Sequence, residues 1–160
     1  MAADSLMVLN DVNIARSIKI ERRDGHLVGM RGADCPAMAE AMDWLFAKTR
    51  GVHQYRKGYL KPFRFWDDRP GRDDAVCSFS LLMVDPKGCV FQIDQAGGIE
   101  PIPGGYHAIG SGEQYALAVM DHDAKAGAIA AVRAGIKRSA YCRAPIHWFG
   151  LNGKSGEVQE

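Results

Sequence analysis

The order of strand-like and helix-like segments is the feature that most constrains the fold of this chain. Two strands joined by a hairpin turn come first, then a helix, a second group of strands, two helices and a last strand. Grouped strands and grouped helices are typical of a layered α+β protein, whereas alternating βαβ units would predict a parallel sheet. The chain has 160 residues, of which 47% are hydrophobic. It is therefore long enough to bury a core, and we expect a single domain over residues 1–151.

Alternating apolar and polar residues, together with turn-forming residues, predict the strands. Between residues 12 and 22, isoleucines alternate with polar side chains, Asp24-Gly25 is a two-residue turn signal, and residues 26–30 resume the strand pattern. This predicts an antiparallel hairpin. The later candidate strands are residues 76–84 and 89–93 around a turn at 85–88, followed by 99–102 and 146–151.

Apolar residues at helical spacing predict three helices. The first covers residues 34–51, with Asp34 as its N-cap. The second follows Ser111, which forms a capping-box pattern with the glutamine three positions later. The third runs over residues 124–140, with Asp123 as a candidate cap.

Two stretches depart from these patterns. Residues 51–75 interleave six basic with five aromatic side chains and are interrupted by proline and glycine. Such interleaving can bind single-stranded nucleic acid, here through residues 51–72. Four aspartates in the same stretch offset much of the charge, so we favour an irregular surface insertion. Residues 152–160 are a polar tail that is expected to fray.

Charge and composition exclude several functional classes. Twenty Lys and Arg oppose 19 Asp and Glu, a net charge of +1, which gives no general attraction to nucleic acid or to an anionic membrane. No apolar run approaches the roughly 20 residues that span a bilayer, and the first residues lack a basic leader, so we expect a cytoplasmic protein. No cofactor is implied. The cysteines show no CxxC spacing, which disfavours a zinc site or a redox pair; they are Cys35, Cys77, Cys89 and Cys142.

Three short motifs occur in a fixed order. They are Ala2-Ala3-Asp4-Ser5 before a strand, Ser17-Ile18-Lys19-Ile20 followed by Asp24-Gly25-His26 and Gly32, and Gly110-Ser111-Gly112 before an alanine-rich helix. With these motifs the chain resembles the proteasome-like and HslV-like peptidases of the N-terminal nucleophile hydrolase superfamily, of bacterial or phage type. The resemblance covers nearly the whole chain. It implies a four-layer αββα sandwich, with the first strand of the family missing or shortened here.

The resemblance also implies a reaction, the hydrolysis of a peptide bond by an N-terminal threonine. The α-amine of that threonine serves as general base, which is reasonable because a free α-amine titrates at about 8. Asp4 matches the family's aspartate that fixes a lysine, and Lys19 matches that lysine, which lies beside the nucleophile. Gly32 matches the glycine whose amide faces the oxyanion, and Ser111 matches the serine near the amine.

Each of these residues also has a plainer interpretation. Asp4 suits a turn or the end of a strand. Lys19 faces solvent if the isoleucines on either side of it face a core. Gly32 permits a tight turn, and Ser111 suits a helix N-cap. Four matches in the family's order favour the family interpretation for the fold.

The chain departs from the family at its start and in its last helix. Residue 1 is methionine, followed by Ala2, so no threonine stands in the family's position and the chain as it stands is expected to be inactive. Two explanations stay open: a start that lies upstream and supplies a threonine, or a non-catalytic member with a structural or assembly role. Lys137 falls near the place of a family aspartate, where a lysine would repel a protonated amine.

Other sites are weaker candidates. Cys142 could pair with His107 or His147 in a thiol hydrolase, although a buried inert thiol is the favoured interpretation. Residues 121–123 read Asp-His-Asp, but neighbours on a helix do not share a face, so no metal site is predicted. By analogy with the family we expect a homo-oligomer, and a peptide as substrate if the protein is active.

Overall fold

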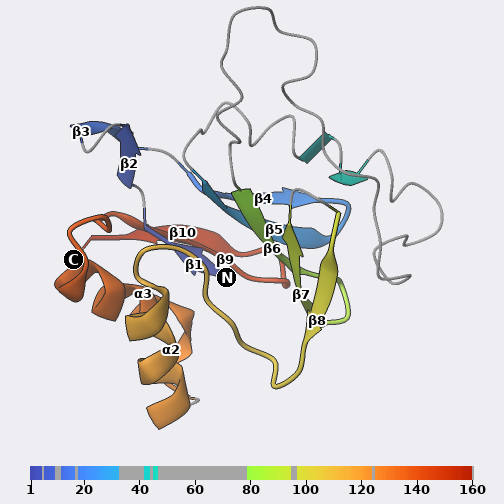
Figure 1. The fold of residues 1–160 in the computed structure, drawn as a ribbon. Coiled ribbons are helices and arrows are strands. Elements are labelled where there is room, and N and C mark those ends of the chain that lie inside the picture. Colours follow the sequence, from blue (N-terminus) through green and yellow to red (C-terminus); the bar gives the residue numbers. More distant parts are fainter. Residues whose placement is uncertain are drawn as a thin grey trace, which may run out of the picture.

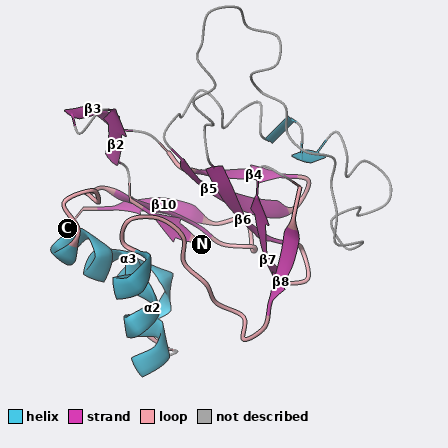
Figure 2. Cartoon of the chain, in the orientation of Figure 1, coloured by secondary structure: helices cyan, strands magenta, loops and turns pink. Residues whose placement is uncertain are grey.

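The structure is a computed structural model that describes residues 1–4, 6–9, 12–16, 18–32, 42–43, 45–46, 79–94, 97–123 and 125–159. Its strands gather in sheets at the centre, and helices α2 and α3 lie beside one of them (Figures 1 and 2). Predictions for residues 51–75, including an insertion and a nucleic-acid surface, fall outside the described residues, as does Asp34. None of the helices in the described ranges is both long and apolar enough to cross a membrane.

The largest sheet is antiparallel, with the strand order β4-β5-β6-β7-β8. The Asp24-Gly25 turn between β4 and β5 has φ angles of 49° and 77°, both positive as a type I′ turn requires. The predicted hairpin is therefore confirmed for residues 20–23 and 26–32. The prediction of one strand over residues 12–22 is wrong, because residues 12–16 pair with residues 6–9 in a separate sheet. The five strands are β4 (Ile20–Arg23), β5 (His26–Gly32), β6 (Phe79–Val84), β7 (Val90–Asp94) and β8 (Ile99–Ile102).

The second predicted turn joins β6 to β7, and a buried carboxylate holds it. Asp85 Oδ1 accepts hydrogen bonds from the backbone N–H groups of Lys87, at 2.8 Å, and Cys89, at 2.9 Å. Asp85 is fully buried, so these bonds replace the water that an isolated carboxylate would need.

A second sheet has the order β1-β9-β10, and both outer strands pair antiparallel with β9. Its strands are β1 (Ala2–Ala3), β9 (Ile146–Phe149) and β10 (Ser155–Val158). The expectation of a frayed tail is therefore wrong, because the backbone of residues 155–158 is hydrogen-bonded to β9. Strands β2 (Leu6–Leu9) and β3 (Val12–Arg16) form a separate antiparallel pair.

Helical residues lie on the outer faces of the two larger sheets. Helices α2 (Glu113–His122) and α3 (Gly127–Arg138) contact each other, and α3 contacts β1 and β9. The helical residues Met42, Leu45 and Phe46 instead pack on the five-stranded sheet. The two sheets meet through β4 and β9. The layers thus follow the order α, β, β, α that the resemblance implies.

Alternate residues of the central strands make the main core. The register pairs Met30 with Leu81 and Leu81 with Ile93, so these side chains share one face of the sheet. The helical residues cover that face. The buried cluster consists of Val28, Met30, Met42, Leu45, Phe46, Phe79, Leu81, Met83, Phe91 and Ile93.

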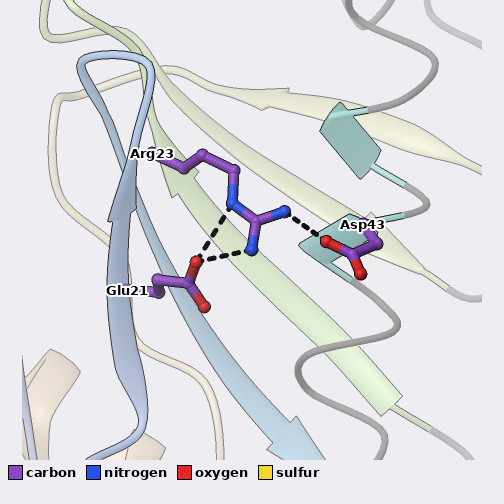
Figure 3. A network of polar contacts seen from close by, with 3 residues as sticks. All are labelled: Glu21, Arg23 and Asp43. Atoms are coloured by element: carbon purple, nitrogen blue, oxygen red, sulfur yellow. Dashed lines mark hydrogen bonds and ion pairs between the residues drawn. The ribbon is translucent and has the colours of Figure 1, made fainter.

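Arg23 connects the β4–β5 hairpin to the helical residues over the sheet (Figure 3). Its Nε and Nη2 donate to Glu21 Oε1 at 3.0 and 2.7 Å, and its Nη1 donates to Asp43 Oδ1 at 2.6 Å. The guanidinium carbon lies 5.4 Å from the centre of the Phe46 ring. These groups are partly exposed, so the network contributes at most about 1 kcal/mol and mainly orients the helical residues.

The predicted N-caps of α2 and α3 are wrong. The N-cap of α2 is Gly112, and no side chain caps that helix, so Ser111 has no capping role. The N-cap of α3 is Ala126. Asp123 instead terminates α2, and its carboxylate accepts a hydrogen bond from the Lys125 backbone N–H at 2.9 Å.

Replacing Leu81 by alanine tests the core. Leu81 is 0% exposed on the central strand β6, so Leu81→Ala is expected to lower the free energy of unfolding by about 2–5 kcal/mol, measured by urea denaturation. The matched control is Leu82→Ala on the opposite face of the same strand, where the side chain is only half-buried. If Leu82→Ala lowered the free energy of unfolding as much as Leu81→Ala does, this assignment of the core would be contradicted.

Candidate functional site

An ion pair between Asp4 and Lys19 forms the centre of the candidate site. Lys19 Nζ lies 2.9 Å from Asp4 Oδ1, and the two side chains are 21% and 15% exposed. Asp4 follows β1 of one sheet, and Lys19 precedes β4 of the other. Partial removal from water strengthens the attraction relative to a surface pair.

The local backbone explains why Lys19 faces Asp4 and not solvent. The Lys19 carbonyl oxygen accepts a hydrogen bond from the Met30 N–H at 3.1 Å, which holds the segment against β5. The neighbouring isoleucines do not share one buried face, because Ile18 is 56% exposed and Ile20 is 3% exposed. The plainer interpretation, in which Lys19 simply faces water, is therefore wrong.

The segment between α3 and β9 forms a turn that reaches Asp4. The Cys142 N–H donates to the Ser139 carbonyl oxygen, and the Tyr141 N–H donates to Ser139 Oγ, both at 3.3 Å. The Arg143 N–H then donates to Asp4 Oδ2 at 3.3 Å. Both carboxylate oxygens of Asp4 are thus bound, one by Lys19 and one by this turn.

Ser111 lies on a glycine loop that spans the gap between β5 and this turn. A side-chain carbon at Gly110 would lie 3.9 Å from Arg31 Cβ, and one at Gly112 would lie 3.0 Å from Cys142 Sγ. Gly110 has a φ of 106°, which favours glycine. Ser111 is exposed between these two contacts, and its hydroxyl makes no hydrogen bond to the part of the chain that the structure describes.

Gly32 is the last residue of β5 and is exposed. It pairs with Phe79 of β6 and directly follows Arg31, the residue that Gly110 approaches. The structure therefore brings Asp4 and Lys19 into direct contact. It places Gly32 and Ser111 on the segments that adjoin them.

Cys142 is a member of this cluster that sequence reasoning placed elsewhere. Its side chain hydrogen-bonds the Ser139 side chain, and the charges of Asp4 and Lys19 both act on it. The expected histidine partners are engaged elsewhere. His107 Nε2 lies 2.8 Å from a glutamine oxygen, and His147 Nδ1 lies 3.8 Å from a glutamate oxygen. The sequence signal for Cys142 was its position between the last helix and the last predicted strand.

The surroundings of Cys142 suppress its reactivity. Burial raises the pKa of the Cys142 thiol, and the negative charge of Asp4 raises it further. The Ser139 hydrogen bond and the positive charge of Lys19 oppose this shift without cancelling it. The thiol is therefore protonated at neutral pH and is a poor nucleophile.

The Met1 amine is part of the sheet. It donates to the Phe149 carbonyl oxygen at 2.8 Å, and the Phe149 N–H donates to the Met1 oxygen at 2.9 Å. Burial lowers the pKa of this amine. The amine is therefore bound to the backbone of β9 and makes no hydrogen bond to Asp4 or Lys19.

No candidate metal site occurs among the described residues. They contain no group of three or more His, Cys, Asp and Glu side chains that could hold an ion. In the Asp-His-Asp triplet, Asp121 accepts a hydrogen bond from the Tyr106 hydroxyl at 2.7 Å, and Asp123 binds the Lys125 N–H. The triplet is thus used in local structure.

Solved structures show which proteins share this arrangement. Thiobacillus denitrificans BPH, solved in complex with epoxomicin, superposes with a TM-score of 0.61 at 18% identity, covering 99% of this chain and 91% of its own. Eukaryotic HslV from Trypanosoma brucei superposes with a TM-score of 0.67 at 17% identity, covering 99% and 92%. The chain has the proteasome/HslV-type fold. No protein-family profile matches the sequence, and no curated protein does.

This likeness confirms the fold that the three short motifs implied. In the proteasome/HslV-type fold of this chain, the aspartate of the first motif and the lysine of the second form the 2.9 Å ion pair. The glycines of the third motif contact the segments on either side of that pair. The motifs therefore meet in one region, although more than 100 residues of sequence separate the first from the third.

The charges around Cys142 predict how its thiol reacts. Asp4→Asn removes a charge that raises the thiol pKa, so alkylation by iodoacetamide near pH 8 should accelerate, by up to about tenfold per pKa unit. Lys19→Met removes the opposing charge and should slow the reaction. Mass spectrometry of the Cys142 peptide over time measures both rates.

Cys89 serves as the internal control for this experiment, because it is an exposed free thiol in the same molecule. Its rate should be the same in the wild-type chain and both variants. Equal rates at Cys142 in all three proteins would contradict the electrostatic coupling with Asp4 and Lys19.

Proposed function

We propose that this chain contributes Asp4, Lys19, Gly32 and Ser111 to a proteasome/HslV-type site for the hydrolysis of peptide bonds. The observation that carries the proposal is the 2.9 Å ion pair between Asp4 and Lys19, which joins the two sheets. The failure of the plainer interpretations adds support, because Lys19 does not simply face water and Ser111 does not cap a helix.

In the proposed reaction, a threonine hydroxyl gives its proton to the α-amine of the same residue and attacks the peptide carbonyl carbon. Lys19 supplies a positive charge beside the nucleophile, and Asp4 fixes Lys19. The Gly32 amide donates to the oxyanion that forms, and Ser111 hydrogen-bonds the amine. These roles follow the resemblance, and the geometry of the site is compatible with them.

The nucleophile is the component that the described residues do not supply to the pair. The single threonine of the sequence is Thr49, which lies outside the described residues. The Met1 amine is bound to β9, and the Cys142 thiol is protonated. We therefore propose that the 160-residue chain alone does not hydrolyse peptides by this reaction.

A non-catalytic structural or assembly role, in a phage-associated or cytoplasmic particle, is the second candidate. The partly buried, protonated thiol of Cys142 favours it. Proteasome/HslV-type proteins are oligomeric assemblies, which supports self-association of this chain in either case. Light scattering of the purified chain measures that association.

The activity of the purified 160-residue chain is the first test. Fluorogenic peptides should show no hydrolysis above background, because the described residues place no threonine beside Lys19. Turnover that Lys19→Ala abolishes would overturn the proposed inactivity and would identify another nucleophile in the chain.

The N-terminal residue of the mature protein decides between the peptidase and the assembly role. The protein is expressed from its native locus with the upstream sequence retained, and its intact mass and N-terminal sequence are determined. A threonine as residue one ahead of Met1 supports the peptidase. A start at Met1 or Ala2 supports the assembly role and rejects the threonine mechanism.

In a threonine-bearing form, the role of Lys19 can be measured directly. Lys19→Ala should lower kcat by at least about 100-fold, since it removes the charge beside the nucleophile. The matched control is Lys87→Ala, an exposed lysine in the β6–β7 turn, which should leave kcat unchanged. Equal activities of the two variants would contradict the proposed role of Lys19.

A further inference from the structure

Four exposed basic residues lie on the segments that surround the Asp4–Lys19 pair. We name them the cationic rim: Arg31, Lys137, Arg138 and Arg143. Lys137 and Arg138 occupy the last turn of α3, Arg143 follows the turn that reaches Asp4, and Arg31 lies near the end of β5. None of the four makes an ion pair with another described residue.

The backbone brings these cations to the site from two sides. The Ser139 N–H donates to the Gly135 oxygen at 2.8 Å, and the following turn reverses the chain between Arg138 and Arg143. The Arg143 N–H is bound to Asp4 Oδ2, so this residue lies directly beside the pair. Arg31 approaches from β5, where its Cβ lies 3.9 Å from the place of a side-chain carbon on Gly110.

Among the described residues, few acidic side chains lie near the rim in the sequence. Residues 125–159 contain six Lys and Arg and one glutamate, a net charge of +5, whereas the whole chain carries +1. Asp4 is already paired with Lys19, and Glu113 in the first turn of α2 is the acidic group nearest in sequence to the glycine loop. Cations at a helix C-terminus complement its dipole, which accounts for Lys137 and Arg138. The helix dipole does not account for Arg31 and Arg143.

We infer that the cationic rim binds acidic segments of peptides and brings them to the Asp4–Lys19 pair. This inference rests on the proposed function, because a peptide is then the ligand of the site. Arginine binds carboxylates through paired N–H donors. The side chain of Arg31 donates a hydrogen bond to Ser80 Oγ at 3.5 Å, but no cation of the rim loses an ion pair with a described residue when an acidic ligand arrives. Single-stranded nucleic acid is the competing anionic partner, and the test below distinguishes it from an acidic peptide.

Fluorescence anisotropy with the full 160-residue chain tests the inference. The probes are a labelled Glu-rich peptide, the same peptide with every Glu replaced by Gln, and a single-stranded oligonucleotide of equal charge. The Glu peptide should bind at least about tenfold more tightly than the Gln peptide, and its affinity should fall with added salt. The oligonucleotide should bind more weakly than the Glu peptide.

Charge reversal then locates the binding surface. Arg138→Glu combined with Arg143→Glu should weaken binding of the Glu peptide by at least about tenfold. The control is Lys125→Glu combined with Lys154→Glu, which changes the net charge equally at exposed positions. Lys125 precedes α3, and Lys154 lies in the turn between β9 and β10, so both are away from the Asp4 end of β9. The control should stay within about twofold of the wild-type chain.

Several outcomes would overturn the inference. In the wild-type chain, these are equal binding of the Glu and Gln peptides, no binding of either peptide, and tighter binding of the oligonucleotide than of the Glu peptide. In the variants, it is a loss of Glu-peptide affinity in the control that equals the loss in the rim variant. The peptide comparison uses the wild-type chain, so a variant that fails to fold does not remove the test. Binding requires no hydrolysis. Charge-selective binding by the 160-residue chain, together with a threonine-bearing form whose cleavage does not depend on Lys19, would reject the proposed function and keep the rim. Lys19-dependent cleavage by the threonine-bearing form without charge-selective binding would reject the rim alone.

Discussion

The ion pair between Asp4 and Lys19 is the contact on which the arrangement of the site depends. It joins the residue after β1 to the residue before β4, so it connects the ends of strands in two different sheets. A partly buried charge that loses its partner is left poorly solvated, which makes such a pair costly to separate. The Arg143 N–H binds the second oxygen of the same carboxylate and thereby fixes the α3–β9 turn over the pair.

Close packing between two glycines positions the loop that carries Ser111. A side-chain carbon at Gly112 would lie 3.1 Å from the Gly135 Cα, a distance that forces one of the two segments to shift. Glycine at both positions lets the start of α2 approach α3 and brings Cys142 against the loop. Ser111 is then exposed on the loop that approaches Cys142, and no side chain caps the helix that follows. The pair and the glycine contact together explain why distant segments meet here.

Local sequence patterns predicted which segments form strands and helices better than they predicted where those elements begin and end. The hairpin at Asp24-Gly25 was predictable because a two-residue type I′ turn depends on its own two residues. The caps at Ser111 and Asp123 were not, since a capping pattern is satisfied only if the helix begins where the pattern expects. Strand β10 was missed because its short, polar sequence becomes a strand only through pairing with β9.

The sequence by itself determined the order of the strands β4 to β9 and of helices α2 and α3, the hairpin turns, and the motifs that led to the fold and to Asp4, Lys19, Gly32 and Ser111. Those features depend on periodicity and on residues that are neighbours in the chain. Only the tertiary structure decided that Asp4 and Lys19 touch, that Cys142 lies beside them as a protonated thiol, and that Arg143 joins the basic end of α3 at the same place. These contacts arise from the packing of two sheets and two helices, and no local pattern carries the relative position of segments far apart in sequence.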